Sequence, residues 1–568
     1  MHSGSTGDAA YDMSVIVQDG PSKADPEPSE DADGDGVAGL AIGRVVSVSG
    51  GQVICLLDGA AAITPEQLAD PLQIGSLIKL DAARNSVFGI VGGLSIPIPS
   101  RDGSEELKII EVELIGEIIE DGDGGPGVFR RGVSTSPGLG DVAFAATHDE
   151  LKRVYDRRTD DAIEIGHLQQ SPTVPAYAVV DDLLGKHFSI VGTTGSGKSC
   201  AVSLILNGIV EKHDNAHVIL LDPHAEYAHA FGDVAEVIDL DDLTLPHWLF
   251  TFEEIVEIVF GAEADELVAE TAILRDLIQK CKVRFMGVSE ESRMVTVDTP
   301  VPYKTGDMLK LLDQTMGRLE NRNDLSPFQR VKSRLVALQG DRRFSFMFPA
   351  SVVVRDNLSE ILSRIFRVPV NGKPISILNL SGVPSEVLNV VVSVLARMTF
   401  DFALWSEQSV PLLLVCEEAH RYAPTSSMEG FEPTKRALSR IAKEGRKYGV
   451  SLGVITQRPS ELTTTVLSQC NTIFAMRMTS EKDQDYLRAA MSDATSGLLD
   501  SLPSLGNGEA IAVGEGVVVP MRLVFATLPE DKLPKGSTAR FSKTWQGGDP
   551  SIDALDQVVA RWRQFESK

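Results

Sequence analysis

The chain has 568 residues, of which 43% are hydrophobic and 23% are charged, and its formal net charge is −27. This length is enough for about two to four domains, and the negative charge excludes a protein that coats nucleic acid over its whole surface, because each phosphate contact requires a cation. The five cysteines have no metal-binding or disulfide spacing, and we find neither an apolar run of membrane-spanning length nor a signal pattern. We therefore expect a cytoplasmic protein without membrane contact.

The first 37 residues are strongly acidic. They contain nine carboxylates and one lysine, Lys23, with few large apolar side chains. A segment of this composition buries too little apolar surface to offset the conformational entropy lost on folding. We expect residues 1–37 to be a disordered acidic tail.

Residues 38–150 contain short β-type runs that are interrupted by glycine and aspartate. In the run ELKIIEVELIGEII, apolar residues at positions 110, 112 and 114 alternate with two glutamates, as in a half-buried strand. Several such runs with turn signals between them are typical of a small β-barrel.

From about residue 151 the pattern changes, and apolar strand candidates alternate with longer helical segments. Strands separated by helices predict an α/β fold with a parallel sheet covered on both faces, and we expect this core to span 151–528. A mostly helical stretch at about 248–371 is long enough to be an insertion, and 529–568 is a C-terminal extension that includes a short helix. The strand candidates are Phe188–Val191, His217–Leu221, Ile375–Leu380, Leu412–Val415, Ser451–Thr456 and Thr472–Met476.

A phosphate-binding motif follows the first of these strands. The pattern G-x-x-x-x-G-K-[ST] lies between the strand FSIV and the helix CAVSLILNGIVEK, which is the context that gives such a motif its meaning. Its glycines let backbone amides converge on phosphate oxygens, its lysine adds a positive charge, its serine hydroxyl is a Mg²⁺ ligand, and the helix N-terminus adds partial positive charge. The predicted nucleotide site consists of Gly192, Thr193, Thr194, Gly195, Ser196, Gly197, Lys198, Ser199 and Cys200.

Two adjacent acids complete the predicted ATPase site. Glu417 and Glu418 follow the apolar strand Leu412–Val415, and their adjacency places them on opposite sides of the strand end. We assign Glu417, with Ser199, to the Mg²⁺ shell and Glu418 to the polarisation of the attacking water. The second acid favours ATP hydrolysis over a nucleotide switch.

Four motifs in this order resemble one family. The runs KHFSIVGTTGSGKS, LLDPHAEYAHAF, CEEAHRYAP and IAKEGRKYGVSLGVITQRPSEL resemble the HerA group of hexameric DNA-translocating ATPases, within the HerA/FtsK branch of P-loop proteins. The resemblance covers roughly residues 39–528 and implies a RecA-like core with a helical insertion behind an N-terminal β-barrel. One departure is Ala225, which stands in DPHAEY where a glycine is usual.

The resemblance also implies roles for residues outside the phosphate loop. Gln457 matches a position that senses the γ-phosphate, and Arg440 and Arg446 match a region that supplies an arginine finger to the neighbouring subunit. Lys186 matches a position where some members have an arginine that contacts nucleotide in its own subunit. From the residues alone, a solvated helix face remains the less favoured alternative for the two arginines.

Three polar residues after the strand LLD remain open to two interpretations. Asp222, His224 and Glu226 form a metal site or a set of structural and phosphate-side groups, and we favour the second because no further histidine is near. We interpret His420 as a coupling or core residue.

A closed ring would reconcile DNA binding with an acidic chain, because only the residues lining its pore must be basic. The candidates for this lining are Lys280, Lys282, Arg284, Arg330, Lys332, Arg334, Arg342, Arg343, Lys435 and Arg436.

The main hypothesis is an ATP-driven homohexameric translocase or helicase on double-stranded DNA, which works with a separately encoded nuclease or other effector in end processing or in defence against phage. The first alternative is a nucleotide-dependent scaffold ring that regulates a partner enzyme. The second is a protein-pumping motor of the conjugation type. Glu418 and Gln457 favour turnover over a pure scaffold.

Overall fold

The computed structural model describes residues 39–567 except 58–71, 83–84, 98–106, 120–126, 156–158, 241, 288, 319–324, 349–354, 427–430, 492–495, 537–540 and 547–551. The predicted acidic tail, residues 1–37, lies outside the described residues.

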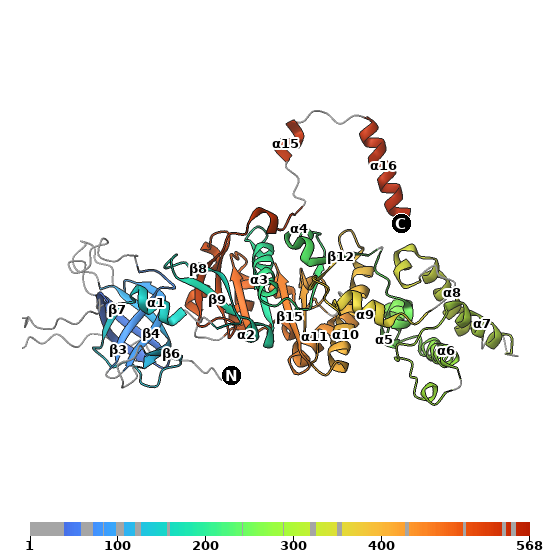
Figure 1. Cartoon of the computed structure of the whole chain (residues 1–568), viewed down its shortest axis with the longest axis horizontal. Coiled ribbons are helices and arrows are strands. Elements are labelled where there is room, and N and C mark those ends of the chain that lie inside the picture. The colour runs from blue at the N-terminus through green and yellow to red at the C-terminus, as the bar shows by residue number, and fades with distance from the viewer. Residues whose placement is uncertain are drawn as a thin grey trace, which may run out of the picture. The chain divides into compact units, whose positions relative to one another are not determined.

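The N-terminal part of the described chain is a small closed β-barrel (Figure 1). Its strands pair antiparallel in the order β2-β1-β7-β3-β4-β5, the β2–β5 pairing closes the barrel, and β6 adds to the outer side of β5. Alternating residues such as Val45, Val87 and Val112 fill the interior. The strands are β1 (Ala41–Ser49), β2 (Gln52–Leu57), β3 (Leu77–Ala82), β4 (Asn85–Ser95), β5 (Ile109–Ile119), β6 (Val128–Arg131) and β7 (Val142–Ala145), and α1 (His148–Tyr155) follows.

An eleven-stranded mixed sheet forms the core of the described residues. Its first seven strands, in the order β12-β13-β11-β14-β15-β10-β16, are parallel, and β17, β18, β8 and β9 continue it antiparallel. The parallel strands are β10 (Phe188–Val191), β11 (Val218–Asp222), β12 (Ala235–Asp239), β13 (Ile375–Asn379), β14 (Leu412–Cys416), β15 (Val450–Thr456) and β16 (Thr472–Met476). The antiparallel strands are β8 (Ala162–Leu168), β9 (Pro175–Val179), β17 (Glu509–Val513) and β18 (Met521–Phe525).

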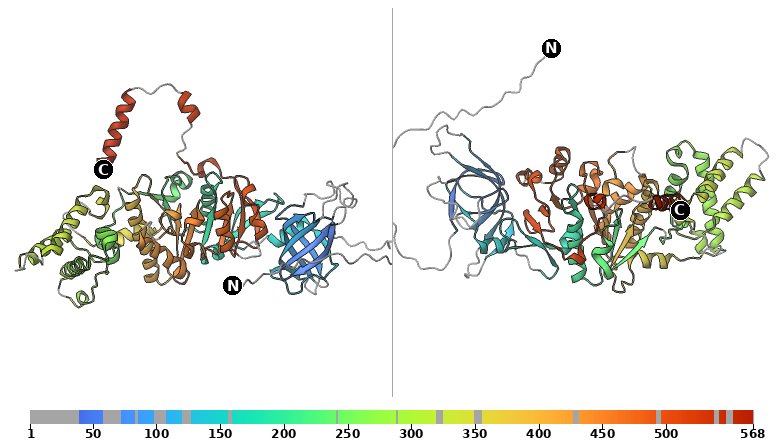
Figure 2. Two further views of the ribbon diagram at one scale, coloured as in Figure 1. Left: turned by 180° about the vertical axis from the view of Figure 1, so that it is seen from behind. Right: turned by 90° about the horizontal axis from the view of Figure 1, so that it is seen from above.

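Helices cover both faces of this sheet (Figure 2). The crossover from β10 to β11 runs along the sheet in the opposite direction to those from β13 to β14 and from β14 to β15. Because such crossovers are right-handed, α3 (Lys198–Lys212) lies on one face, and α10 (Ser385–Trp405) and α11 (Glu432–Tyr448) lie on the other. The shorter helices are α2 (Val180–Gly185), α4 (Ala228–Phe231), α12 (Thr464–Leu467), α13 (Glu481–Ala490) and α14 (Ser496–Leu499).

The helix α10 has the length and apolar composition of a membrane span, unlike any other helix in the described part of the chain. We did not expect such a helix from the sequence. Its most apolar window is 72% buried, and it packs against α11 and the strands β14 and β15. We therefore describe it as a core helix.

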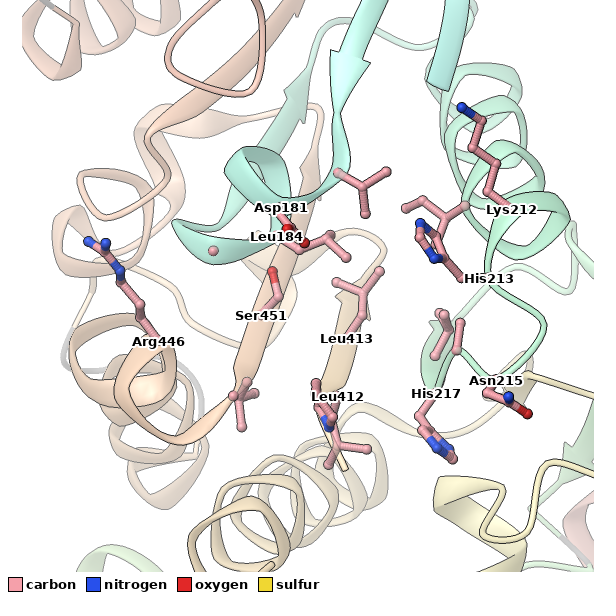
Figure 3. A pocket seen from close by; sticks show the side chains of 18 of the residues that line it. Asp181, Leu184, Lys212, His213, Asn215, His217, Leu412, Leu413, Arg446 and Ser451 are labelled. Carbon is pink, nitrogen blue, oxygen red and sulfur yellow. The ribbon is translucent and has the colours of Figure 1, made fainter. Parts of the chain in front are cut away.

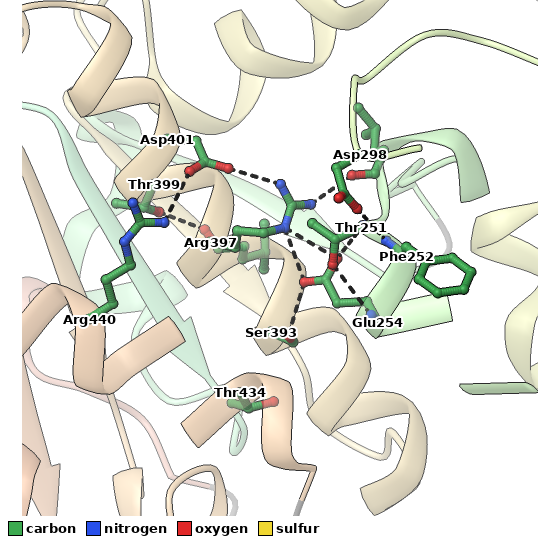
Figure 4. Close-up of polar contacts among 12 residues, drawn as sticks. Thr251, Phe252, Glu254, Asp298, Ser393, Arg397, Thr399, Asp401, Thr434 and Arg440 are labelled. Atoms are coloured by element: carbon green, nitrogen blue, oxygen red, sulfur yellow. Dashed lines mark hydrogen bonds and ion pairs between the residues drawn. The ribbon is translucent and has the colours of Figure 1, made fainter. Parts of the chain in front are cut away.

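The helical insertion lies between β12 and β13. Its helices are α5 (Phe252–Phe260), α6 (Val268–Met286), α7 (Thr305–Met316), α8 (Leu325–Gly340) and α9 (Leu358–Phe366). A buried ion network joins α5 to α10, because Arg397 of α10 binds Glu254 and Asp401 (Figure 4). The C-terminal extension contains α15 (Phe541–Gln546) and α16 (Ile552–Ser567). The predicted fold class is confirmed: a P-loop α/β core with a helical insertion, preceded by a small barrel.

Candidate nucleotide site

The phosphate loop connects β10 to α3 at the carboxyl edge of the parallel strands. Gly195 and Gly197 have φ angles of 77° and 110°, which only glycine adopts without strain. A Cβ at Gly197 would lie 3.3 Å from the backbone nitrogen of Gly508, which donates to the Ser196 carbonyl at 2.8 Å. The loop is therefore shaped by its own glycines and held by the start of β17.

Lys198 is buried at the base of this loop. Its ammonium donates to the Thr193 carbonyl at 3.2 Å. Burial lowers the pKa of Lys198, and the nearby carboxylates of Glu417, Glu418 and Glu226 oppose this shift. An ammonium has three donors, so a buried lysine in a loop of converging amides fits a phosphate group.

The paired glutamates lie at the end of β14, and both are buried. Tyr227 donates its hydroxyl to Oε2 of Glu417 at 2.7 Å. Burial raises the pKa of Glu417 to about 8, so an incoming cation would be needed to favour its charged form. Glu418 adopts φ +52°, a left-handed conformation that costs a non-glycine residue of the order of 1 kcal/mol or more.

Gln457 joins the second glutamate to the phosphate loop. It follows β15, donates through Nε2 to Glu418, and accepts from the Thr194 hydroxyl. Nδ1 of His420 lies 3.3 Å from Oε2 of Glu418 and 3.0 Å from the Thr456 hydroxyl. The position that the resemblance assigned to γ-phosphate sensing thus contacts both the loop and the residue assigned to water.

The turn after β11 contacts the residues assigned to the metal. Asp222 accepts backbone N–H groups from His224, Glu226 and Tyr227 at 3.0–3.2 Å, so its carboxylate is used to shape the turn. Glu226 accepts the Ser199 hydroxyl at 2.9 Å. No cluster of three or more metal-ligating side chains occurs among the described residues.

The backbone of this turn explains the departure at Ala225. Its φ is +55°, in the left-handed region that glycine adopts without a Cβ penalty. The glycine expected from the resemblance would relieve this strain, whereas the alanine keeps it. The sequence alone did not reveal Tyr227 as a site residue, because a tyrosine after an acidic turn is typical of a buried residue of the hydrophobic core.

Lys186 is not placed at the phosphate loop of its own chain. It precedes the amino end of β10, whereas the loop follows the carboxyl end of that strand. Its ammonium pairs with Glu515. A nucleotide contact within the same subunit therefore does not fit this geometry, since the whole strand lies between the lysine and the loop.

Arg440 and Arg446 also lie away from their own phosphate loop, on α11. The Arg440 guanidinium is 4.0 Å from the centre of the Phe400 ring and 3.8 Å from Asp401. Arg446 lines a groove of about 780 Å³ at the amino edge of the sheet (Figure 3). Gln457 lies at the opposite end of β15 from this groove, so Arg446 does not complete the site within one chain, and Arg440 is engaged with α10 instead.

Most of the basic residues predicted to line a pore are already paired with carboxylates. Lys282 is fully buried and donates to the carbonyls of Val297 and Thr299 at 2.7 and 2.6 Å, so its assignment to a DNA surface is wrong. Among the ten described candidates, Arg284 and Arg342 are the two exposed residues for which we find no ion pair. The paired residues are Lys280, Arg330, Lys332, Arg334, Arg343, Lys435 and Arg436.

The sequence is similar to that of HerA helicases. Residues 163–399 match the family described as "Helicase HerA, central domain". The DNA double-strand break repair helicase HerA of Pyrococcus furiosus is 27% identical over 470 residues, which are 75% of this chain and 78% of that protein. The protein of the same name from Sulfurisphaera tokodaii is 25% identical over 521 residues, or 87% of this chain and 96% of that protein. Among solved structures, VirB4 of Thermoanaerobacter pseudethanolicus aligns with a TM-score of 0.47 at 16% identity, over 66% of this chain and 98% of that chain.

Proposed function

We propose that the chain is an ATP-hydrolysing homohexameric motor that moves along double-stranded DNA. The premise is that residues 163–399 match the HerA central domain and that the chain is similar to HerA helicases. The motor works in the cytoplasm with a separately encoded nuclease or other effector, in DNA end processing or in defence against phage. The relatives whose names include DNA double-strand break repair support the DNA substrate.

The site residues have distinct roles in this proposal. Bound Mg²⁺ would neutralise charge on the β- and γ-phosphates. Residues of the phosphate loop hold the triphosphate, with Lys198 as the cation, and Ser199 and Glu417 hold the metal. Glu418 accepts hydrogen bonding from the attacking water and orients it towards the γ-phosphate.

The observation that carries the proposal is the chain of contacts from Thr194 through Gln457 to Glu418. A γ-phosphate entering the loop competes for the Thr194 hydroxyl and changes what Gln457 can bind. Since Gln457 also holds Glu418, occupancy of the loop and position of the water-activating acid are linked through one amide. A motor needs this link, whereas a passive nucleotide-binding scaffold does not.

The arginines of α11 support an assembly in which neighbours complete each other's sites. Arg440 is about half exposed, and Arg446 borders an open groove, so both are accessible to a second subunit. An arginine supplied in trans is worth about 10³- to 10⁵-fold in turnover. We assign this role to one of these two residues in a hexameric ring.

The decisive experiment measures ATPase activity with and without linear duplex DNA, over a range of salt concentrations. A translocase should be stimulated by DNA, and its DNA affinity should fall with salt because each cation–phosphate contact releases about 0.9 counterion in duplex DNA. Sequence preference should be weak, since a motor must hold backbone rather than base edges. An ATPase rate that is indifferent to DNA would contradict the proposal.

One observation favours the scaffold as a second candidate. The candidate pore residues are mostly engaged with carboxylates of the same chain, so fewer free cations are available for phosphate than the sequence suggests. Exposed ion pairs are weak, typically below about 1 kcal/mol, and can exchange a carboxylate for a phosphate. DNA-independent ATPase together with stable binding of an effector would support the scaffold.

A further inference from the structure

We propose that Glu226 and Tyr227 are positioning residues for Mg²⁺, because the turn that carries them fixes both side chains assigned to the metal shell. This inference rests on the proposed ATPase site and extends it to two residues in the turn that follows β11. The turn is residues 222–227, between β11 and α4.

The two adjacent residues reach two different elements. Glu226 accepts the hydroxyl of Ser199, at the start of α3, at 2.9 Å. Tyr227 donates to Oε2 of Glu417, at the end of β14, at 2.7 Å. Ser199 lies in the first turn of α3 and Glu417 follows β14, so no single element fixes the position of one relative to the other. The strand β11 lies beside β14 and carries at its end the turn that contacts both residues.

The turn itself is rigid. Asp222 accepts three of its backbone N–H groups, and Ala225 is held in a left-handed conformation, which persists only where the surroundings enforce it. Tyr227 is fully buried and stacks on Phe231 with ring centroids 6.3 Å apart. Its hydroxyl therefore has a fixed position from which to orient the Glu417 carboxylate.

Tyr227 engages one carboxylate oxygen and leaves the other available to the cation shell. A neutral hydroxyl that donates to a carboxylate stabilises its charged form and restricts its rotation. Outer-shell partners of this kind typically contribute 10- to 100-fold to metal affinity. Glu226 adds a third carboxylate close to the site and holds the hydroxyl oxygen of Ser199.

The chain offers a matched control for the tyrosine. Tyr422 is also fully buried, follows β14, the strand that leads to Glu417, by a few residues, and has a hydroxyl without a hydrogen-bond partner in the described structure. Tyr422→Phe removes a buried hydroxyl of the same kind without removing a contact. Tyr227→Phe removes one that contacts Glu417.

The experiment measures affinity for a fluorescent ADP analogue in EDTA and during a Mg²⁺ titration, without DNA. Tyr227→Phe should raise the half-saturating Mg²⁺ concentration about 10-fold or more and leave affinity in EDTA unchanged. Tyr422→Phe should match the wild type in the half-saturating Mg²⁺ concentration and in the affinity measured in EDTA. Glu226→Ala removes the acceptor of the Ser199 hydroxyl and should also raise the half-saturating Mg²⁺ concentration.

The outcomes separate this inference from the proposed function. Tyr227→Phe with the wild-type Mg²⁺ dependence would overturn the inference, and so would an equal loss of affinity in EDTA, which would mean that the tyrosine supports the whole loop. If Tyr227→Phe does not fold, the Glu226→Ala protein tests the inference in its place. A wild-type Mg²⁺ dependence of nucleotide binding in that variant would then overturn the inference. Failure of the wild type to bind Mg²⁺–nucleotide would instead contradict the proposed ATPase site.

Discussion

Replacing Arg397 with methionine should loosen the attachment of the helical insertion to the ATPase core. Arg397 of α10 lies 3.1 and 3.2 Å from the two oxygens of Glu254, 3.1 Å from Asp401 and 2.7 Å from the Leu249 carbonyl. Glu254 is buried and belongs to α5, where it forms a capping box with Thr251. The network is therefore a polar link between the first helix of the insertion and the core (Figure 4).

The size of the effect follows from burial. Arg397→Met leaves Glu254 with the backbone N–H of Thr251 and the hydroxyl of Ser393 as partners, but without a countercharge. Removing one partner of a buried ion pair costs about 3–5 kcal/mol. If α5 opens locally, amide exchange in residues 252–260 should then accelerate by about 10²- to 10³-fold or more, since 1.4 kcal/mol corresponds to a factor of ten.

Hydrogen exchange read by mass spectrometry tests this prediction segment by segment. Arg343→Met is the matched control, because Arg343 binds Asp341 through two nitrogens but is 53% exposed, and exposed pairs contribute about 0–1 kcal/mol. Glu254→Gln combined with Arg397→Met should recover most of the protection, because the buried charge is gone. Equal exchange of α5 in the Arg397→Met and Arg343→Met proteins would refute the reasoning.

Three further predictions concern the site and the insertion. Lys198→Ala should abolish nucleotide binding, whereas Glu418→Gln should retain binding and lose about 10²- to 10⁴-fold in turnover; normal turnover of Glu418→Gln would refute its assignment to water. Mixing Arg446→Ala with Lys198→Ala subunits should restore part of the ATPase activity, because some interfaces in a mixed ring contain both intact residues. If no mixing ratio restored activity, and Arg440→Ala gave the same result, the assignment of an arginine that acts in trans would be refuted. Burial lowers the pKa of Lys282 to about 8, so between about pH 8 and 10.5 this lysine is protonated in the unfolded chain and neutral in the folded one. The free energy of unfolding should therefore rise over this pH range, by about 3 kcal/mol in total. A Lys282→Met protein whose denaturant unfolding keeps the wild-type pH dependence would contradict this prediction.

Much of the parallel core was predictable because its signals are local. The six strand candidates coincide with β10, β11, β13, β14, β15 and β16 to within one residue at each end, since buried parallel strands are continuous apolar runs. The strands missed by the sequence analysis lie beyond these. β8, β12 and β18 have apolar runs that polar residues interrupt, and all five missed strands flank the six predicted ones in the sheet order.

The site divides in the same way. By itself the sequence predicted the phosphate loop and the paired glutamates, because each follows an apolar strand and parallel strands bring their carboxyl ends to one edge, whereas Gln457 came from the family resemblance. Only the tertiary structure placed Lys186 at the opposite edge, buried Lys282, and brought Tyr227 to Glu417. These contacts join residues 15 to 329 positions apart, and such pairings depend on how whole elements pack, which no local pattern of residues encodes.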